Sequence, residues 1–149
     1  MEIYDKDGKR IAVSNPPDKR IFDNMVIRNA SLAGRELEII HFDGSDLQGS
    51  DFSGADLYGA ILMDSNFDYC VFRDADLRSA HMYKVSFRHA DMRRAQFSLD
   101  QMGGSLVLTA VDFSGANLDG ADFTGAIYDS DTVFPDGFNP EDRGLKLKI

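Results

Sequence analysis

The sequence predicts an all-β fold, a square-sectioned β-solenoid of about five coils, and three features of its spacing carry that prediction. An apolar residue stands at every fifth position, a small or branched residue usually precedes it by two positions, and glycine often follows it by two. The apolar centres are Leu32, Leu37, Phe42, Leu47, Phe52, Leu57, Leu62, Phe67, Phe72, Leu77, Met82, Phe87, Met92, Phe97 and Met102. After a slip of one residue near Gly103-Gly104 they continue as Leu108, Phe113, Leu118, Phe123 and Tyr128.

A period of five fits neither a regular helix nor a straight strand. On an α-helix, five residues advance about 500°, so the centres would wander around the helix and form no stripe. On a straight strand, an odd spacing would put successive centres on opposite faces. A bend every five residues resolves the conflict, because each centre and the small residue two positions before it can then both point inward. Glycines such as Gly44, Gly54 and Gly115 permit the positive φ that such a bend requires.

A bend of about a right angle every five residues closes one coil in about twenty residues, and successive coils stack at roughly 4.8 Å. The interior then holds stacked Phe and Leu side chains between Ala, Ser and the single cysteine, Cys70. Residues twenty apart lie over one another on the outside. The outer columns expected from this spacing are Glu36, Asp56, Asp76, Gln96 and Asn117, and Ser31, Asp51, Val71, Asp91 and Asp112.

The two ends depart from the repeat and divide the chain into three parts. Residues 1–21 are expected to form a short hairpin across Asp7-Gly8 and then a linker or cap, and residues 22–133 the β-helix, with a register slip near 103–107. Residues 134–149 are rich in turn-forming residues and are expected to form a C-terminal cap, since an open solenoid end exposes unpaired strand edges.

Units of the form A-(D/N)-(L/F)-X-X occur at residues 55–59, 75–79, 116–120 and 121–125, and they resemble the pentapeptide repeat family. The resemblance covers roughly residues 30–133 and implies a right-handed quadrilateral β-helix. The small position is lost at Arg35 and Ile40, and the pattern is broken at Asp100 and Leu106 beside the slip. We expect the backbone to be irregular or bulged at these four places.

Composition limits the function classes. The chain has 149 residues and a formal net charge of −9, is 43% hydrophobic, and contains one cysteine, which cannot form an internal disulfide. With no signal-peptide pattern and no apolar run of the roughly 18 residues a spanning helix needs, a cytoplasmic location away from membranes is expected. The acid excess argues against direct binding of nucleic acid or an anionic membrane.

The sequence contains no pattern typical of catalysis or of a cofactor site. His41, His81 and His89 do not have metal-ligand spacing, Cys70 occupies an inward position, and no phosphate-binding glycine loop is present. The Asp pattern matches neither calcium-binding repeats nor an EF-hand loop. We therefore expect no cofactor, no metal and no enzymatic activity, because a filled solenoid has no interior pocket.

The outer charges give a candidate interaction surface. Residues 41–70 and 101–142 contain acidic residues but neither Lys nor Arg, whereas residues 71–100 form an arginine-containing belt. We expect Asp68 to face Arg88, and Arg73 to lie over Arg93 despite their like charge. The candidate surface comprises Asp51, Asp56, Asp76, Arg73, Arg78, Arg93 and Arg94. Its arginines could also bind a carboxylate-rich or phosphate-bearing partner.

Two function classes remain. The first is a non-catalytic protein-interaction module, a rigid rod whose charged faces dock an unidentified protein. The alternative is implied by the family resemblance, because the quinolone-resistance members of that family act in this way: a DNA mimic that binds a type II topoisomerase, DNA gyrase, through its acidic surface. The arginine belt, the short rod and the lack of a C-terminal helical extension count against the mimic. We expect a monomer or a weak end-to-end dimer.

Overall fold

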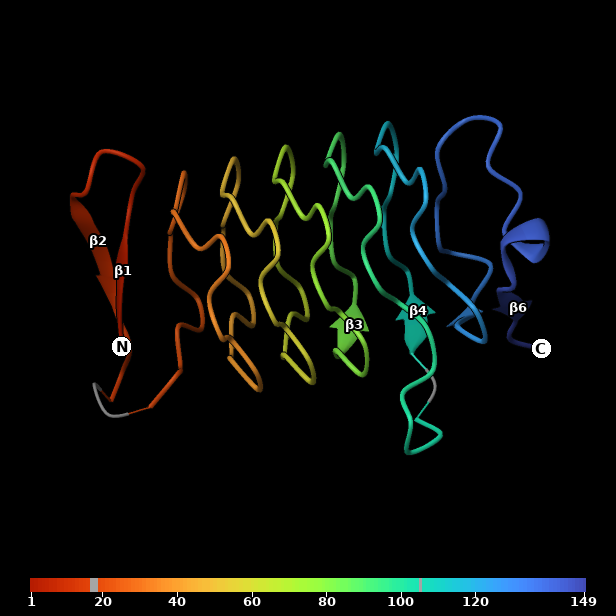
Figure 1. Cartoon of the computed structure of the whole chain (residues 1–149), viewed down its shortest axis with the longest axis horizontal. Helices are drawn as coiled ribbons and strands as arrows, with labels where there is room; N and C mark the ends of the chain where they lie inside the picture. Colours follow the sequence, from red (N-terminus) through yellow and green to blue (C-terminus); the bar gives the residue numbers. More distant parts are fainter. Residues whose placement is uncertain (17–18, 105) are drawn as a thin grey trace.

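The computed structural model describes residues 1–16, 19–104 and 106–149, and they form a rod of stacked coils (Figure 1). An antiparallel hairpin of β1 (Glu2–Tyr4) and β2 (Arg10–Val13) lies at one end of the rod. Short parallel strands β3 (Met82–Tyr83), β4 (Val107–Thr109), β5 (Ile127–Tyr128) and β6 (Lys146–Leu147) make one sheet in that order. A 3-10 turn, η1 (Glu141–Arg143), precedes β6 at the other end.

Each coil has four sides, and isolated parallel bridges connect each side to the coils before and after it. We name the four faces A to D after the outward residue that precedes each inward centre. Face A carries Ile21, His41, Ile61, His81, Val107, Ile127 and Lys146; face B carries Val26, Asp46, Asn66, Ser86, Asp112 and Val133. Face C carries Ser31, Asp51, Val71, Asp91 and Asn117; face D carries Glu36, Asp56, Asp76, Gln96 and Asp122.

The bends are hydrogen-bonded turns whose third residue has positive φ. In one of them, Ala55 N donates to Phe52 O at 3.0 Å across Gly54, which has a φ of 63°. This is the geometry of a type II turn, which glycine adopts without strain. Non-glycine residues such as Asp74 and His89 take the same conformation at other corners. The predicted inward and outward alternation is confirmed.

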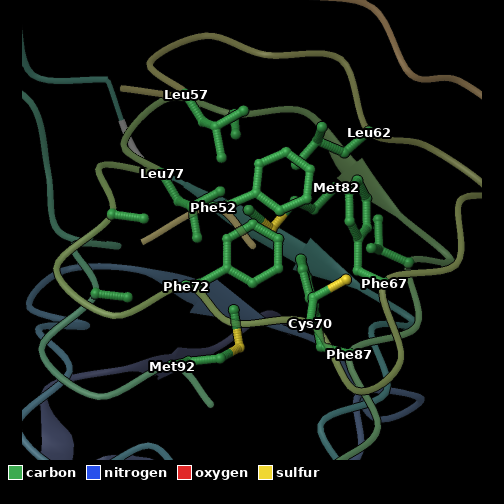
Figure 2. Packing of buried hydrophobic residues seen from close by; sticks show 14 of the residues in the cluster. Phe52, Leu57, Leu62, Phe67, Cys70, Phe72, Leu77, Met82, Phe87 and Met92 are labelled. Atoms are coloured by element: carbon green, nitrogen blue, oxygen red, sulfur yellow. The ribbon is translucent and has the colours of Figure 1, made fainter. Parts of the chain in front are cut away.

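The interior is a continuous apolar stack. Phe52 and Phe72 rings are parallel, with centroids 4.8 Å apart, and Phe67 stacks on Phe87 at 5.5 Å (Figure 2). Inward serines are satisfied by the coil before: Ser50 Oγ donates to Ile27 O at 3.2 Å. The core carries no buried unpaired side-chain nitrogen or oxygen atom among the described residues.

Three expectations about register were wrong: that Asn117 continues the column of Gln96, that Asp112 continues the column of Asp91, and that Met102 is an inward centre. After the interruption, residues pair 26 apart rather than about 21, so that Asp91 pairs with Asn117 and Gln96 with Asp122. The cause lies in segment 98–104, which starts in register, with Leu99 N donating to Thr124 O at 3.1 Å, and leaves the coil from Asp100 onward to project at the foot of β4 (Figure 1). Met102, predicted to be an inward centre, lies on this projection and is 90% exposed.

The backbone is also regular at Arg35 and Ile40, where we expected a bulge. Ile40 is fully buried in the small inward position, and the preceding corner is formed by Ile39 with a φ of 56°. Arg35 is exposed to solvent, so its own side chain does not take the inward position. The coil therefore tolerates both a larger and an absent small residue near its first turns.

Candidate interaction surface

The seven predicted surface residues lie on two adjacent faces of the rod. Asp51 belongs to face C, and Asp56 and Asp76 neighbour one another on face D. The arginines occupy turn positions, Arg73, Arg93 and Arg94 between faces C and D, and Arg78 after face D. The structure therefore brings all seven onto one continuous side of the molecule.

The stacked arginines Arg73 and Arg93 share one carboxylate. Arg73 Nε donates to Asp91 Oδ2 at 2.5 Å, and Arg93 Nη2 donates to the same oxygen at 2.8 Å. These hydrogen bonds, that of Arg93 first, hold the pKa of Asp91 well below its ordinary value. The like charges that the sequence placed one above the other are therefore bridged by Asp91.

The other arginines of the belt are paired in the same way. Arg78 donates two hydrogen bonds to the Asp76 carboxylate, from Nη2 to Oδ2 at 2.6 Å and from Nε to Oδ1 at 2.9 Å. Arg94 reaches the Asp74 carboxylate of the coil before with bonds of 2.7 and 2.8 Å, and this lowers the pKa of Asp74. Because its guanidinium groups are already bound to the protein's own carboxylates, the belt is poorly suited to capturing an external anion.

Two carboxylates of the candidate surface have no such partner. Asp51 Oδ1 accepts hydrogen bonds from Ser53 N at 2.9 Å and Ser53 Oγ at 2.6 Å. Asp56 Oδ1 accepts one from Tyr58 N at 3.0 Å. Within the part of the chain that the structure describes, no Lys or Arg side chain forms a salt bridge with either. These hydrogen bonds orient the two carboxylates on a surface where Asp51 is exposed and Asp56 is half-buried.

At the turn between faces B and C, the predicted pairing of Asp68 with Arg88 is confirmed at 2.8 Å. Asp68 is only 3% exposed and also accepts hydrogen bonds from Ser86 Oγ and Arg88 N. A buried carboxylate whose hydrogen bonds are all made stabilises the fold, but removal of a partner would leave its charge buried and uncompensated.

The cysteine and the three histidines, which were weighed above as catalytic or metal-binding residues, lie in the core or on the outer surface of the coils. Cys70 is buried, its Sγ donates to Leu47 O at 3.0 Å, and burial raises its pKa to about 12, so a thiolate is disfavoured. His89 stacks on Tyr69 with ring centroids 5.0 Å apart, whereas His41 and His81 lie on face A. Among residues 1–16, 19–104 and 106–149, no three His, Cys, Asp or Glu side chains are grouped to hold a metal ion.

Sequence reasoning missed the role of Asp100. Its Oδ2 accepts hydrogen bonds from Tyr58 OH at 2.9 Å and Ser79 Oγ at 2.5 Å, and its Oδ1 accepts from Met102 N and Gly104 N. These bonds, that of Ser79 first, lower the pKa of Asp100 to about 2. One carboxylate thus anchors the projecting segment 98–104 to two coils. The signal for it was the break in the repeat at Asp100 itself.

Comparison with known proteins supports the repeat assignment. A model of pentapeptide repeats matches residues 26–64, 60–98 and 107–127 and finds eight copies. No curated protein gives a significant match. Among the described residues, no helix has the length and apolar character needed to cross a membrane.

Several solved structures are similar to this chain. A pentapeptide repeat protein from Nostoc PCC 7120 is 25% identical over 87% of this chain and 86% of its own, with a TM-score of 0.44. One from Cyanothece 51142 is 21% identical over 76% of this chain and 63% of its own, with a TM-score of 0.40. QnrB1, a plasmid-mediated fluoroquinolone resistance protein, is 17% identical over 85% and 92%, with a TM-score of 0.36.

Proposed function

The chain belongs to the pentapeptide repeat family, and from that premise we propose that it is a non-catalytic protein-interaction module. In this proposal the rod is a rigid scaffold, and the charged side formed by faces C and D docks a protein partner. Residues 22–133 are the docking body, and residues 1–21 and 134–149 cap its ends. The filled interior supports the proposal, because it leaves the outer faces as the place where binding can occur.

The observation that carries the proposal is the contrast between paired and unpaired charge on faces C and D. Arg73, Arg78, Arg93 and Arg94 are engaged by carboxylates of the protein, whereas Asp51 and Asp56 form no salt bridge within the described chain. The side therefore presents negative charge in a fixed geometry, which suits a basic protein surface. In this reading the arginines orient Asp76 and Asp91 and are not themselves the main contacts.

A site-specific cross-linking experiment tests this function. A photoreactive amino acid replaces Ser53, beside Asp51 on face C, or Ser114, which bonds Asp112 on face B with the same geometry. In extracts of the native host, we expect a defined cross-linked product from position 53 that is lost at high salt and in the Asp51→Asn/Asp56→Asn variant. A product from position 114 alone, or one insensitive to both changes, contradicts docking through faces C and D.

The alternative is a DNA mimic that occupies the DNA-binding surface of DNA gyrase. The net charge of −9, together with arginines neutralised within the rod, favours it. A supercoiling assay with purified gyrase at two salt concentrations separates the two functions. Inhibition that fades as salt rises and is lost in the Asp51→Asn/Asp56→Asn variant supports the mimic. Unchanged supercoiling at every dose contradicts the mimic and favours the interaction module.

A further inference from the structure

Face A differs from the charged side in having an apolar centre. Its outward column runs through Ile61, His81, Val107 and Ile127 and holds no carboxylate. Val107 in this column is 38% exposed, and Tyr83 beside it is 42% exposed. An acidic protein thus keeps one strip of its surface apolar, opposite face C on the rod, and such a strip is typical of a contact surface.

The strip also contains a hollow of about 320 Å³. Met63, His81, Tyr83 and Val107 line it together with Ser79, and none of its lining residues is acidic. Ser79 is also one of the two side chains that donate a hydrogen bond to Asp100, so the hollow lies next to the anchor of segment 98–104. An apolar side chain of a partner could enter this hollow without displacing a charged group.

Carboxylates follow face A along one edge. Asp43, Asp64 and Asp129 occupy the turn positions after the inward centres, and among the described residues none of them forms a salt bridge. Lys84 is the one basic residue at the corresponding turn of the coil between them. A complementary surface therefore has an apolar stripe with basic residues beside it.

The spacing of the coils selects a helix over a strand. Coils stack at roughly 4.8 Å, whereas same-face residues of a strand laid along the rod would recur at roughly 6.6 Å. The turns of an α-helix recur every 5.4 Å, so over three coils the mismatch between helix turns and coils adds up to only about 2 Å. We propose that face A binds a basic amphipathic helix of a partner protein, with its apolar stripe along Ile61, His81 and Val107 and its basic side toward Asp43 and Asp64.

This inference rests on the proposed function only in assuming that the rod docks proteins, and it goes beyond it by assigning a second binding face. The probe is a fluorescein-labelled 18-residue peptide of Leu and Lys whose leucines form one helical stripe; the control is a scrambled peptide of the same composition. Fluorescence anisotropy with the full chain at about 0.15 M salt measures binding.

We expect Val107→Asn to raise the Kd at least tenfold and Val71→Asn, an outward valine on face C, to leave it unchanged. Asp43→Asn/Asp64→Asn should weaken binding more than Asp51→Asn/Asp56→Asn, which removes the same charge. Circular dichroism verifies that all four variants are folded.

Three results of the peptide-binding experiment overturn the inference. They are absence of striped-peptide binding, equal binding of the scrambled peptide, and equal losses from the two valine variants. Self-association of the protein that Val107→Asn abolishes, seen by sedimentation, would instead assign the face to a second copy and overturn the helix as its occupant. If face A fails while cross-linking at position 53 succeeds, the proposed function stands without this inference.

Discussion

The inside and the outside of the same coils follow different rules. Inward positions repeat with one chemistry from coil to coil, as in the stack of Phe67, Phe87 and Phe113. Outward positions one residue earlier change from face to face, so that Ile61 and Val107 stand on face A where Asp51 and Asp91 stand on face C. The five-residue rule therefore constrains only the inward pair. The outer columns are free to differ, and their differences are where function should be sought.

The largest expected effect comes from placing a charge inside. Phe72 is fully buried, stacked on Phe52 and in edge contact with Phe67 and Phe87. Phe72→Asp buries an unpaired carboxylate, which costs several kcal/mol and rivals the whole stability of a typical domain, about 5–15 kcal/mol. We expect loss of the cooperative thermal transition by circular dichroism. Asp76→Ala, one coil face away but outward, should cost no more than about 1 kcal/mol, and equal losses would contradict the inward and outward assignment.

A second comparison concerns the corners. A Cβ at Gly115 would overlap the His89 ring, which lies over this turn, whereas a Cβ at Gly54 would meet nothing within 4 Å. Both residues have positive φ, 68° and 63°, so both Ala variants bear the conformational cost of about 1–2 kcal/mol. Gly115→Ala should lose roughly 1 kcal/mol more, because His89 must leave Tyr69. Urea unfolding of the two variants measures the difference. Equal midpoints would show that the His89 ring over Gly115 does not restrict this corner.

The sequence predicted the interior well because an inward position admits few residue types. It could not predict the register after the interruption, because Met102 keeps the five-residue period while lying 90% exposed on segment 98–104. Periodicity alone does not distinguish a coil from a loop of similar composition. Ile40 shows the opposite error, since a large residue in a small position was accommodated without a bulge.

The candidate surface was only partly predictable for a related reason. The twenty-residue spacing placed Asp68 opposite Arg88. The pairing of Arg73 and Arg93 with Asp91 depends on how far each side chain reaches within and between neighbouring coils, and the spacing alone does not predict that reach. Asp100 belongs to no column, so its bonds to Tyr58 and Ser79 become visible only once segment 98–104 is placed.

A smaller effect tests the neutralised belt. Asp91→Asn removes the charge that bridges Arg73 and Arg93, and we expect a loss of about 1 kcal/mol or less, part of which is restored by salt that screens the two arginines. Asp51→Asn, in the same column but without a salt bridge, should change stability less and should not become salt-dependent. Urea unfolding at two salt concentrations measures both, and an identical response of the two variants would mean that the belt is not internally paired in solution.

The smallest effect is local and depends on pH. The pKa of Asp100 is lowered to about 2, so its anchoring of segment 98–104 is complete above the ordinary value of 3.8 and is lost as the pH falls toward 2. With methionine methyl groups labelled for NMR, the signal of Met102 should change with a midpoint near 2 while that of the buried Met92 stays fixed. A midpoint near 4 would show that Asp100 titrates as a free carboxylate, and the segment would then hold its position without the bonds to Ser79 and Tyr58. Because the coils beneath it keep their own hydrogen bonds, release of this segment should leave the global unfolding transition unchanged.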